Sequence, residues 1–174
     1  MCGIIGCFSQ DNCYQKLFSA LKKLEYRGYD SAGIAMLAEG EGGGKISVRK
    51  KKGGAEGLAG APMAGETGIG HTRWATHGAP SDANAHPHVA GKFALVHNGI
   101  VENYSKLKAE LVSAGEVFSS ETDSEVIVKL IARAYAGDFF AAVAAACARL
   151  SGSYAVAVLC EDFPGEIVCA RQKS

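Results

Sequence analysis

The chain has 174 residues, 18 basic and 18 acidic side chains, a formal net charge of +0 and 48% hydrophobic residues. This length fits one domain with a sizeable core, and the balanced charge argues against a nucleic-acid binder. No apolar stretch approaches the roughly 18–20 residues that span a bilayer. No basic segment precedes the first apolar run, so we expect neither a membrane anchor nor a signal peptide.

Six cysteines are present, and none forms a CxxC pair or matches a zinc motif. Most lie in apolar segments, where a buried free thiol is the usual explanation. With no export signal, this predicts a reducing cytoplasm. The five histidines leave a metal protein as an alternative, but no spacing fits one, so we expect no metal and no cofactor.

The first half of the chain alternates short apolar runs with Gly-rich connections. The patterns predict a buried strand over 3–8, an amphipathic helix over about 13–25, and strands over 32–38 and 45–51. Residues 53–66 are expected to form a short helix plus loop, and 67–74 a strand. Residues 75–88 hold two prolines and are expected to be irregular, as functional segments often are.

The second half begins with a strand over 92–99 that is expected to end in a turn. Helices follow over about 101–114, 122–135 and 139–150, and then strands over 153–161 and 166–170. Thr122 with Glu125 matches a helix capping box. Because strands and helices come in separate runs, the order favours an α+β protein over a doubly wound parallel sheet.

Cys2 is the first candidate for chemistry, since cells usually remove an initiator Met that precedes a small residue. The mature chain would then carry a thiol and a free α-amino group on the same residue. A thiolate is the competent nucleophile, and an amine with a pKa of roughly 7.7–8.0 can act as its base. An N-terminal cysteine with no role is the plain alternative.

Three other segments could complete such a site. Arg73 is a rigid fork suited to a carboxylate, with Trp74 beside it as an apolar lid. Asn98 and Gly99 can donate two hydrogen bonds to one oxygen, and Asp123 could hold an ammonium. The plain alternatives are a surface ion pair for the arginine, a turn for Asn-Gly and a helix cap for the aspartate. The ligand implied is an α-amino acid with a side-chain amide.

Six motifs in order join these segments: CGIIG, EYRGYDSAGIA, GHTRWATHG, NAHPH, VHNGIVEN and SETDSEVI, spanning residues 2–127. Together they closely resemble the glutaminase domain of the glutamine–fructose-6-phosphate aminotransferases (isomerizing). These are class II glutamine amidotransferases of the N-terminal nucleophile type. The resemblance implies an α+β fold, a four-layer α/β/β/α sandwich with mainly antiparallel sheets.

For catalysis, the resemblance implies that Cys2 is the nucleophile, with its own α-amino group as base. Asn98 and Gly99 form the oxyanion hole. Arg27 lies near the nucleophile and steadies it, and His86 supports the site. The products are L-glutamate and ammonia, formed through a γ-glutamyl thioester.

For binding of L-glutamine, the resemblance implies that Arg73 holds the α-carboxylate, with Thr76 and His77 lining the pocket. Asp123 holds the α-ammonium, and Trp74 belongs to a mobile loop that covers the site. In the family, the ammonia passes to a sugar isomerase domain that converts fructose 6-phosphate to glucosamine 6-phosphate. The full-length enzyme is expected to be a cytoplasmic homo-oligomer.

The chain stops at ARQKS, where the family continues. We therefore interpret residues 1–174 as a glutaminase domain shortened at its C-terminal end, without sugar isomerase domains. The alternatives are the glutaminase domain of another class II enzyme, such as amidophosphoribosyltransferase, and a fragment that binds glutamine without turnover.

Overall fold

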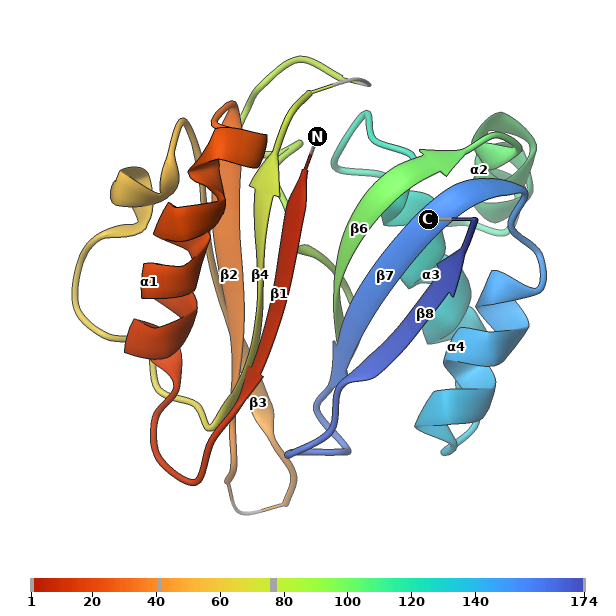
Figure 1. Ribbon diagram of the computed structural model, residues 1–174. Coiled ribbons are helices and arrows are strands. Elements are labelled where there is room, and N and C mark those ends of the chain that lie inside the picture. Colours follow the sequence, from red (N-terminus) through yellow and green to blue (C-terminus); the bar gives the residue numbers. More distant parts are fainter. Residues whose placement is uncertain (1, 41, 76–77, 174) are drawn as a thin grey trace.

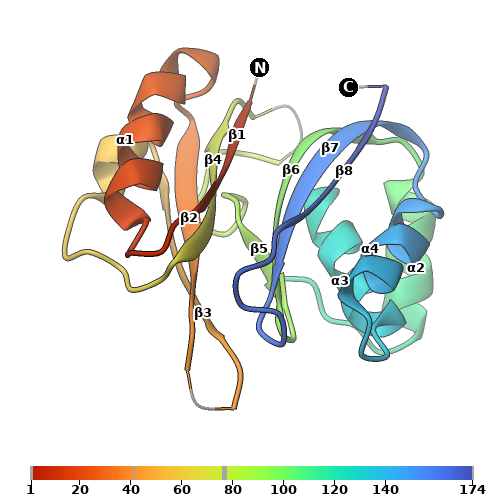
Figure 2. The ribbon, with the colours of Figure 1, turned by 60° about the horizontal axis from the view of Figure 1, so that its bottom comes forward.

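The computed structural model describes residues 2–40, 42–75 and 78–173. Two four-stranded antiparallel sheets lie face to face, and helices cover the outer face of each sheet (Figure 1). The same four layers, helix, sheet, sheet and helices, are seen when the molecule is turned (Figure 2). The predicted α+β sandwich is therefore confirmed.

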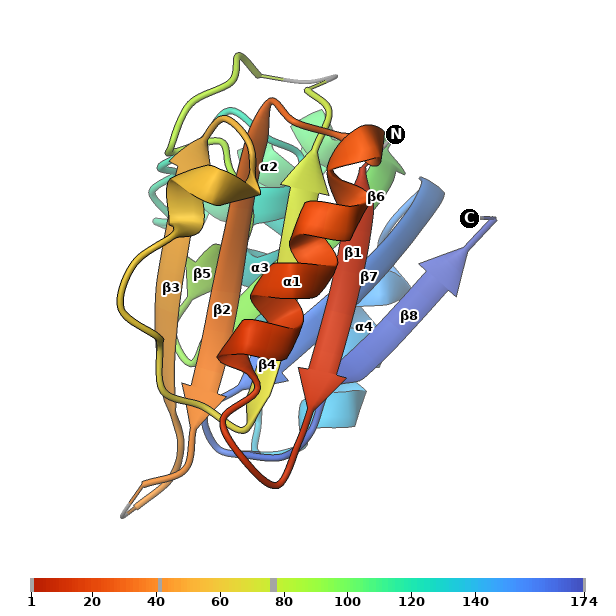
Figure 3. The same cartoon turned by 60° about the vertical axis from the view of Figure 1, so that its left-hand side comes forward.

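The first sheet has the order β1-β4-β2-β3 and carries helix α1 on its outer face (Figure 3). Its elements are β1 Gly3–Phe8, α1 Tyr14–Leu24, β2 Ser31–Ala38, β3 Lys45–Lys52 and β4 Thr67–Arg73, with short 3-10 helices at Glu25–Arg27 and Ala55–Leu58. Leu17 and Leu21 of the amphipathic helix pack with Ile34 and Met36 of the central strand β2. This apolar cluster fixes α1 on the sheet.

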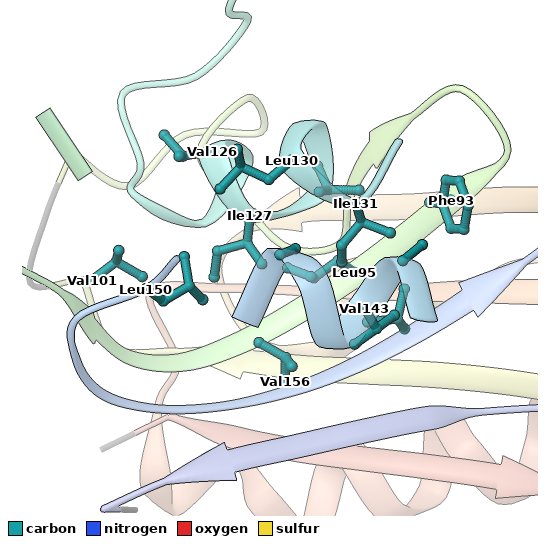
Figure 4. Close-up of a cluster of buried hydrophobic side chains, with 14 of the residues drawn as sticks. Phe93, Leu95, Val101, Val126, Ile127, Leu130, Ile131, Val143, Leu150 and Val156 are labelled. Atoms are coloured by element: carbon teal, nitrogen blue, oxygen red, sulfur yellow. The ribbon is translucent and has the colours of Figure 1, made fainter. Parts of the chain in front are cut away.

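The second sheet has the order β5-β6-β7-β8 and is covered by three helices. Its elements are β5 His88–Ala90, β6 Phe93–Val101, α2 Tyr104–Ser113, α3 Ser124–Ala134, α4 Phe139–Cys147, β7 Gly152–Cys160 and β8 Val168–Gln172. Figure 4 shows side chains of α3 and α4, among them Ile127, Ile131 and Val143, packed over Leu95 and Val156 of the sheet.

A third apolar cluster lies between the two sheets. Leu37 and Ile69 of the first sheet pack with Ala94, Val96 and Leu159 of the second. Side chains along a strand alternate between its faces, so the residues that follow Ile69 and Val96 at intervals of two enter the same space. Those residues include His71 and Arg73 on β4 and Asn98 on β6, which places two of the candidate site residues, Arg73 and Asn98, at one end of the inner layer.

Two local predictions were wrong and one strand was missed. The missed strand is β5, which is only three residues long and begins at the last residue of the segment expected to be irregular. Strand β6 continues through Gly99 to Val101 instead of ending in a turn, and Val101 therefore lies in a strand and not in helix α2. The predicted capping box is also absent, because Asp123 and not Thr122 is the N-cap of α3.

Glu125 shows why the capping box fails. Its carboxylate accepts hydrogen bonds from the backbone N–H of Ser119 at 2.9 Å and of Ser120 at 2.7 Å. Both donors lie before the helix. Glu125 thus anchors the segment that leads into α3, and these hydrogen bonds hold the pKa of its carboxyl below the ordinary value against the opposing effect of burial.

Among the residues that the structure describes, no helix is long and apolar enough to cross a membrane.

Ile69→Ala tests the packing between the sheets. Ile69 is fully buried, and removing its side chain leaves a cavity, so the free energy of unfolding should fall by about 2–5 kcal/mol in urea titrations. Val89→Ala, at a β-strand residue that is 47% exposed, is the control and should cost less than about 1 kcal/mol. Equal losses in the two variants would contradict this account of the core.

Candidate active site

Cys2 lies at the start of β1, next to the end of β4. The antiparallel register pairs Gly3 with Thr72, so Cys2 comes to the turn that leaves β4 after Arg73. The backbone N–H of Trp74 donates to the Cys2 sulfur at 3.2 Å, and that sulfur lies 3.5 Å from the Trp74 carbonyl oxygen. These two contacts hold the sulfur at the turn that follows β4.

Asn98 reaches Cys2 from the opposite sheet. Its side-chain Nδ2 donates to the backbone carbonyl of Cys2 at 3.1 Å, and its Oδ1 lies 2.8 Å from Nε2 of His71. The residue is half-buried at the end of the inner layer. An amide NH2 group held next to Cys2 is a donor of the kind that an oxyanion hole uses.

Gly99 follows within the same strand. It pairs with Tyr154 of β7 and has a φ of 115°. A Cβ at this position would lie 2.1 Å from the carbonyl oxygen of Ser153. Only glycine fits here without moving the backbone of β7. The Asn-Gly dipeptide therefore lies inside strand β6, where Gly99 adopts a positive φ. The prediction that it forms a turn was wrong.

Arg73 is the second residue that the sequence singled out, and it is buried, with 5% of its surface exposed. Its Nη2 donates to the carbonyl of Gly78 at 3.1 Å. Burial lowers its pKa from the ordinary value, and the charges of Cys2, Asp30 and Asp123 oppose that shift. A surface ion pair is thus excluded, because Arg73 is a buried cation, and it interacts electrostatically with Cys2.

Asp123 is also buried, with 6% of its surface exposed. Its Oδ2 accepts the backbone N–H of Val101 at 2.8 Å, and its Oδ1 lies 3.9 Å from Nδ1 of His97. It occupies the N-cap position of α3, but its side chain makes no cap hydrogen bond. The carboxylate is turned toward strand β6 and the site instead of the helix backbone.

Trp74 and Arg27 both lie near Cys2. Trp74 is 45% exposed, and its ring meets that of Tyr29 edge-on at 5.7 Å between centroids. Arg27 donates from Nε to the Tyr26 hydroxyl at 3.1 Å. Arg27, Cys2 and Asn98 line a cavity of about 590 Å³ beside the edges of β1 and β8. That Arg27 steadies Cys2 stays a prediction.

Four histidines lie behind Asn98, all of them buried. His86 stacks on His71 with 4.1 Å between ring centroids, and its Nδ1 accepts the backbone N–H of His97 at 3.1 Å. His88 meets His86 edge-on at 4.7 Å. Burial is the main reason that the pKa of His71 falls to about 3 and those of His86 and His88 fall well below their ordinary value.

Sequence reasoning missed Asp30 and the part that His71 plays. Oδ2 of Asp30 accepts the backbone N–H of Ala75 at 2.8 Å, and its backbone N–H donates to the Arg73 carbonyl at 3.0 Å. Asp30 therefore holds the turn that presents Trp74 to Cys2. Its place in the RGYDS motif was the available signal. For His71, no sequence pattern reveals a contact across two sheets.

Of the predicted site residues, the structure brings together Cys2, Arg73, Trp74, Asn98 and Gly99, with Asp123 behind them. His86 lies one ring away, stacked on His71. Thr76 and His77 lie outside the described residues. Among the described residues, no group of three or more His, Cys, Asp or Glu side chains is arranged to hold a metal ion.

A family model described as the glutamine amidotransferase domain matches residues 71–174. This chain belongs to that family. The glutamine–fructose-6-phosphate aminotransferase (isomerizing) of Symbiobacterium thermophilum is 52% identical over 180 residues, covering 100% of this chain and 29% of that protein. The enzyme of the same name from Aquifex aeolicus is 48% identical, with 100% and 30% covered. The amidotransferase domain described here thus spans less than a third of these curated relatives.

Solved structures agree with the fold of this amidotransferase domain. The glutamine phosphoribosylpyrophosphate amidotransferase from B. subtilis superposes with a TM-score of 0.82 at 26% identity, covering 97% of this chain and 37% of that one. A structure described as the allosteric regulatory enzyme of purine biosynthesis gives 0.78 at 27% identity, covering 91% and 35%.

The buried histidines predict a stability that falls with acid. The pKa of His71 is about 3 in the folded chain and roughly 6.5 in an unfolded one. Below the unfolded value, the unfolded chain binds a proton that the folded chain refuses. His71 alone should then lower the free energy of unfolding by about 2 kcal/mol between pH 6.5 and 5, and His86 and His88 add to this loss.

Urea titrations at pH 7.5, 6 and 5 measure this effect. A free energy of unfolding that stays level over this range would contradict the neutral, buried state of the cluster.

Proposed function

We propose that this domain hydrolyses L-glutamine to L-glutamate and ammonia through a γ-glutamyl thioester on Cys2. The observation that carries the proposal is that Cys2 is held from both sheets, since the Trp74 N–H donates to its sulfur and the Asn98 amide donates to its backbone carbonyl. A nucleophile held in a fixed position and a donor for a developing oxyanion are parts that acyl transfer needs.

Arg73 and Asp123 select the substrate. The buried guanidinium binds the α-carboxylate of glutamine, since its fork matches two carboxylate oxygens. The buried carboxylate of Asp123 binds the α-ammonium. Their opposite charges fit a zwitterion, and an amino acid held at both groups extends its side-chain amide toward Cys2. Family membership and the burial of both side chains support this assignment.

In the first step, the Cys2 thiolate attacks the amide carbon. A carbon–sulfur bond forms, and the carbonyl electron pair moves to oxygen, where Asn98 Nδ2 and the Gly99 N–H donate to it. The tetrahedral adduct collapses as the carbon–nitrogen bond breaks. The leaving nitrogen takes a proton from the α-ammonium of Cys2, so ammonia departs and a thioester remains.

In the second step, water attacks the thioester. The α-amino group of Cys2, now neutral, takes a proton from that water, and the carbon–sulfur bond breaks to release glutamate and the thiolate. Removal of Met1 is a condition of both steps, because an acylated nitrogen at Cys2 has no basic lone pair.

In the full-length protein we assign the ammonia to the synthesis of glucosamine 6-phosphate from fructose 6-phosphate on a sugar isomerase domain. The curated relatives at 52% and 48% identity carry the name of that reaction. The amidophosphoribosyltransferase reading rests on structures at 26% and 27% identity and is the weaker one. We interpret residues 1–174 as glutaminase-domain sequence, and we place the domain in the cytoplasm, in keeping with six free cysteines.

Cys2→Ala tests the nucleophile. The rate of glutamate release from glutamine should fall by at least about 1,000-fold, since no other group replaces the thiolate. Glutamate and ammonia are measured together and should appear in equal amounts from the unchanged protein. Cys147→Ala, at a half-buried cysteine on α4, is the matched control. Activity that survives Cys2→Ala would exclude the thioester route.

Arg73→Lys tests substrate recognition. Lysine keeps the charge but loses the two-pronged contact with the carboxylate, so KM for glutamine should rise at least about tenfold while kcat changes less. Arg149→Lys, at an exposed residue paired with Glu110, controls for loss of a guanidinium elsewhere. An unchanged KM would remove Arg73 from the substrate site.

A further inference from the structure

We propose that His71 is a positioning residue for Asn98: it binds the amide oxygen and thereby turns the NH2 group toward Cys2 and the oxyanion. This inference rests on the proposed function and adds a residue to it. His71 lies on β4 and Asn98 on β6, so the contact crosses from one sheet to the other. The sequence motifs give His71 no role in catalysis.

The contacts of His71 determine which of its ring nitrogens carries the hydrogen. Its Nε2 lies 3.0 Å from the carbonyl oxygen of His97 and 2.8 Å from Oδ1 of Asn98. A backbone carbonyl has no proton to give, so Nε2 must carry the hydrogen and donate it. Burial lowers the pKa of His71 to about 3, so the ring is neutral and holds one N–H only, which lies at Nε2.

The hydrogen bonds to His71 and Cys2 determine the orientation of the Asn98 amide. With Oδ1 accepting from His71, the NH2 group points the other way, where Nδ2 donates to the carbonyl of Cys2 at 3.1 Å. A flipped amide would set NH2 against the N–H of His71 and oxygen against the oxygen of Cys2. Both hydrogen bonds would become repulsions. An oxygen turned toward the site would also repel the negative charge that develops in the reaction.

The ring of His71 is itself held in place by its neighbours. Its ring stacks on His86 at 4.1 Å with 17° between the planes. His86 is fixed in turn, because its Nδ1 accepts the backbone N–H of His97. The segment that carries His86 presses on strand β2 so closely that a Cβ at Gly33 would lie 2.0 Å from the His86 carbonyl oxygen. The donor is therefore held before substrate binds, which is what electrostatic catalysis requires.

The plain alternative is that His71 only fills the inner layer. A packing role predicts that variants lose stability and weaken every ligand alike. A positioning role predicts a selective loss of affinity for species with a tetrahedral oxyanion. The two roles are separated by comparing two ligands. The Cys2 thiol adds to an aldehyde analogue of glutamine and forms a tetrahedral adduct, whereas L-glutamate forms no adduct.

Three variants make the comparison. His71→Phe keeps a ring to stack on His86 but has no donor. His71→Gln restores an N–H near the place of Nε2. His88→Phe, at another buried histidine whose Nε2 bonds the Thr122 hydroxyl, is the matched control for loss of a buried imidazole.

His71→Phe should weaken binding of the aldehyde about 10–100-fold and change the affinity for L-glutamate less than about twofold. His71→Gln should recover most of the lost affinity for the aldehyde. His88→Phe should leave the ratio of the aldehyde and L-glutamate affinities unchanged. Equal losses of aldehyde and glutamate affinity, no loss, or a failure of His71→Gln to improve on His71→Phe would each overturn the proposal.

The tautomer is tested on the unchanged protein, whether or not a variant folds. With ¹⁵N-labelled histidine, the nitrogen resonances of His71 should report a protonated Nε2 and a bare Nδ1 from pH 5 to 9. A proton on Nδ1 or a charged ring would overturn the proposal. A protein that shows the expected tautomer but neither binds the aldehyde nor hydrolyses glutamine would refute the proposed function instead.

Discussion

The antiparallel pairing of β1 with β4 is the constraint on which the site depends. It sets the first residues of the chain beside the last residues of β4, and so brings the Cys2 sulfur to the N–H of Trp74. Backbone hydrogen bonds along the strand pair hold this geometry, and the apolar layer between the sheets fixes it relative to Asn98. Cys2, near the start of the chain, thereby gains the rigidity of a sheet.

The inner layer changes character along its length. At one end it is aliphatic, with Ile69 packed against Val96. Toward Cys2 the same strand faces carry His71, Arg73 and Asn98 in turn. Buried neutral imidazoles and the buried guanidinium of Arg73 make this end polar. In such surroundings hydrogen bonds and charges act more strongly than at the surface.

Much of the fold could be predicted from the sequence. Apolar runs and helical periodicity are local signals, and they gave most strands and helices to within a few residues. Strand β5 is three residues long and has no such signal. Asn98-Gly99 misled because the dipeptide favours a turn, whereas contact with Ser153 uses the same left-handed glycine inside a strand. Glu125 misled because its carboxylate bonds to Ser119 and Ser120 and not to a cap residue.

The site could be predicted only through motifs. Spacing alone could not join Cys2 to Arg73, because their proximity depends on strand register, and it could not join either to Asn98, which lies in the other sheet. The motifs pointed to His86 as a support of the site, but the stacking of His71 on His86 lies beyond both kinds of reasoning. Ring stacking and the Nε2 tautomer of His71 follow from tertiary contacts that no local pattern records.

The most direct test of the central claim is the mass of the intact protein before and after exposure to a glutamine analogue that carries a diazoketone in place of the amide. The account predicts a chain that has lost Met1 and that gains one adduct, mapped to Cys2 and prevented by an excess of glutamine. A folded chain that lacks Met1 and gains no adduct, or gains it on another cysteine, would contradict the assignment of Cys2 as the nucleophile.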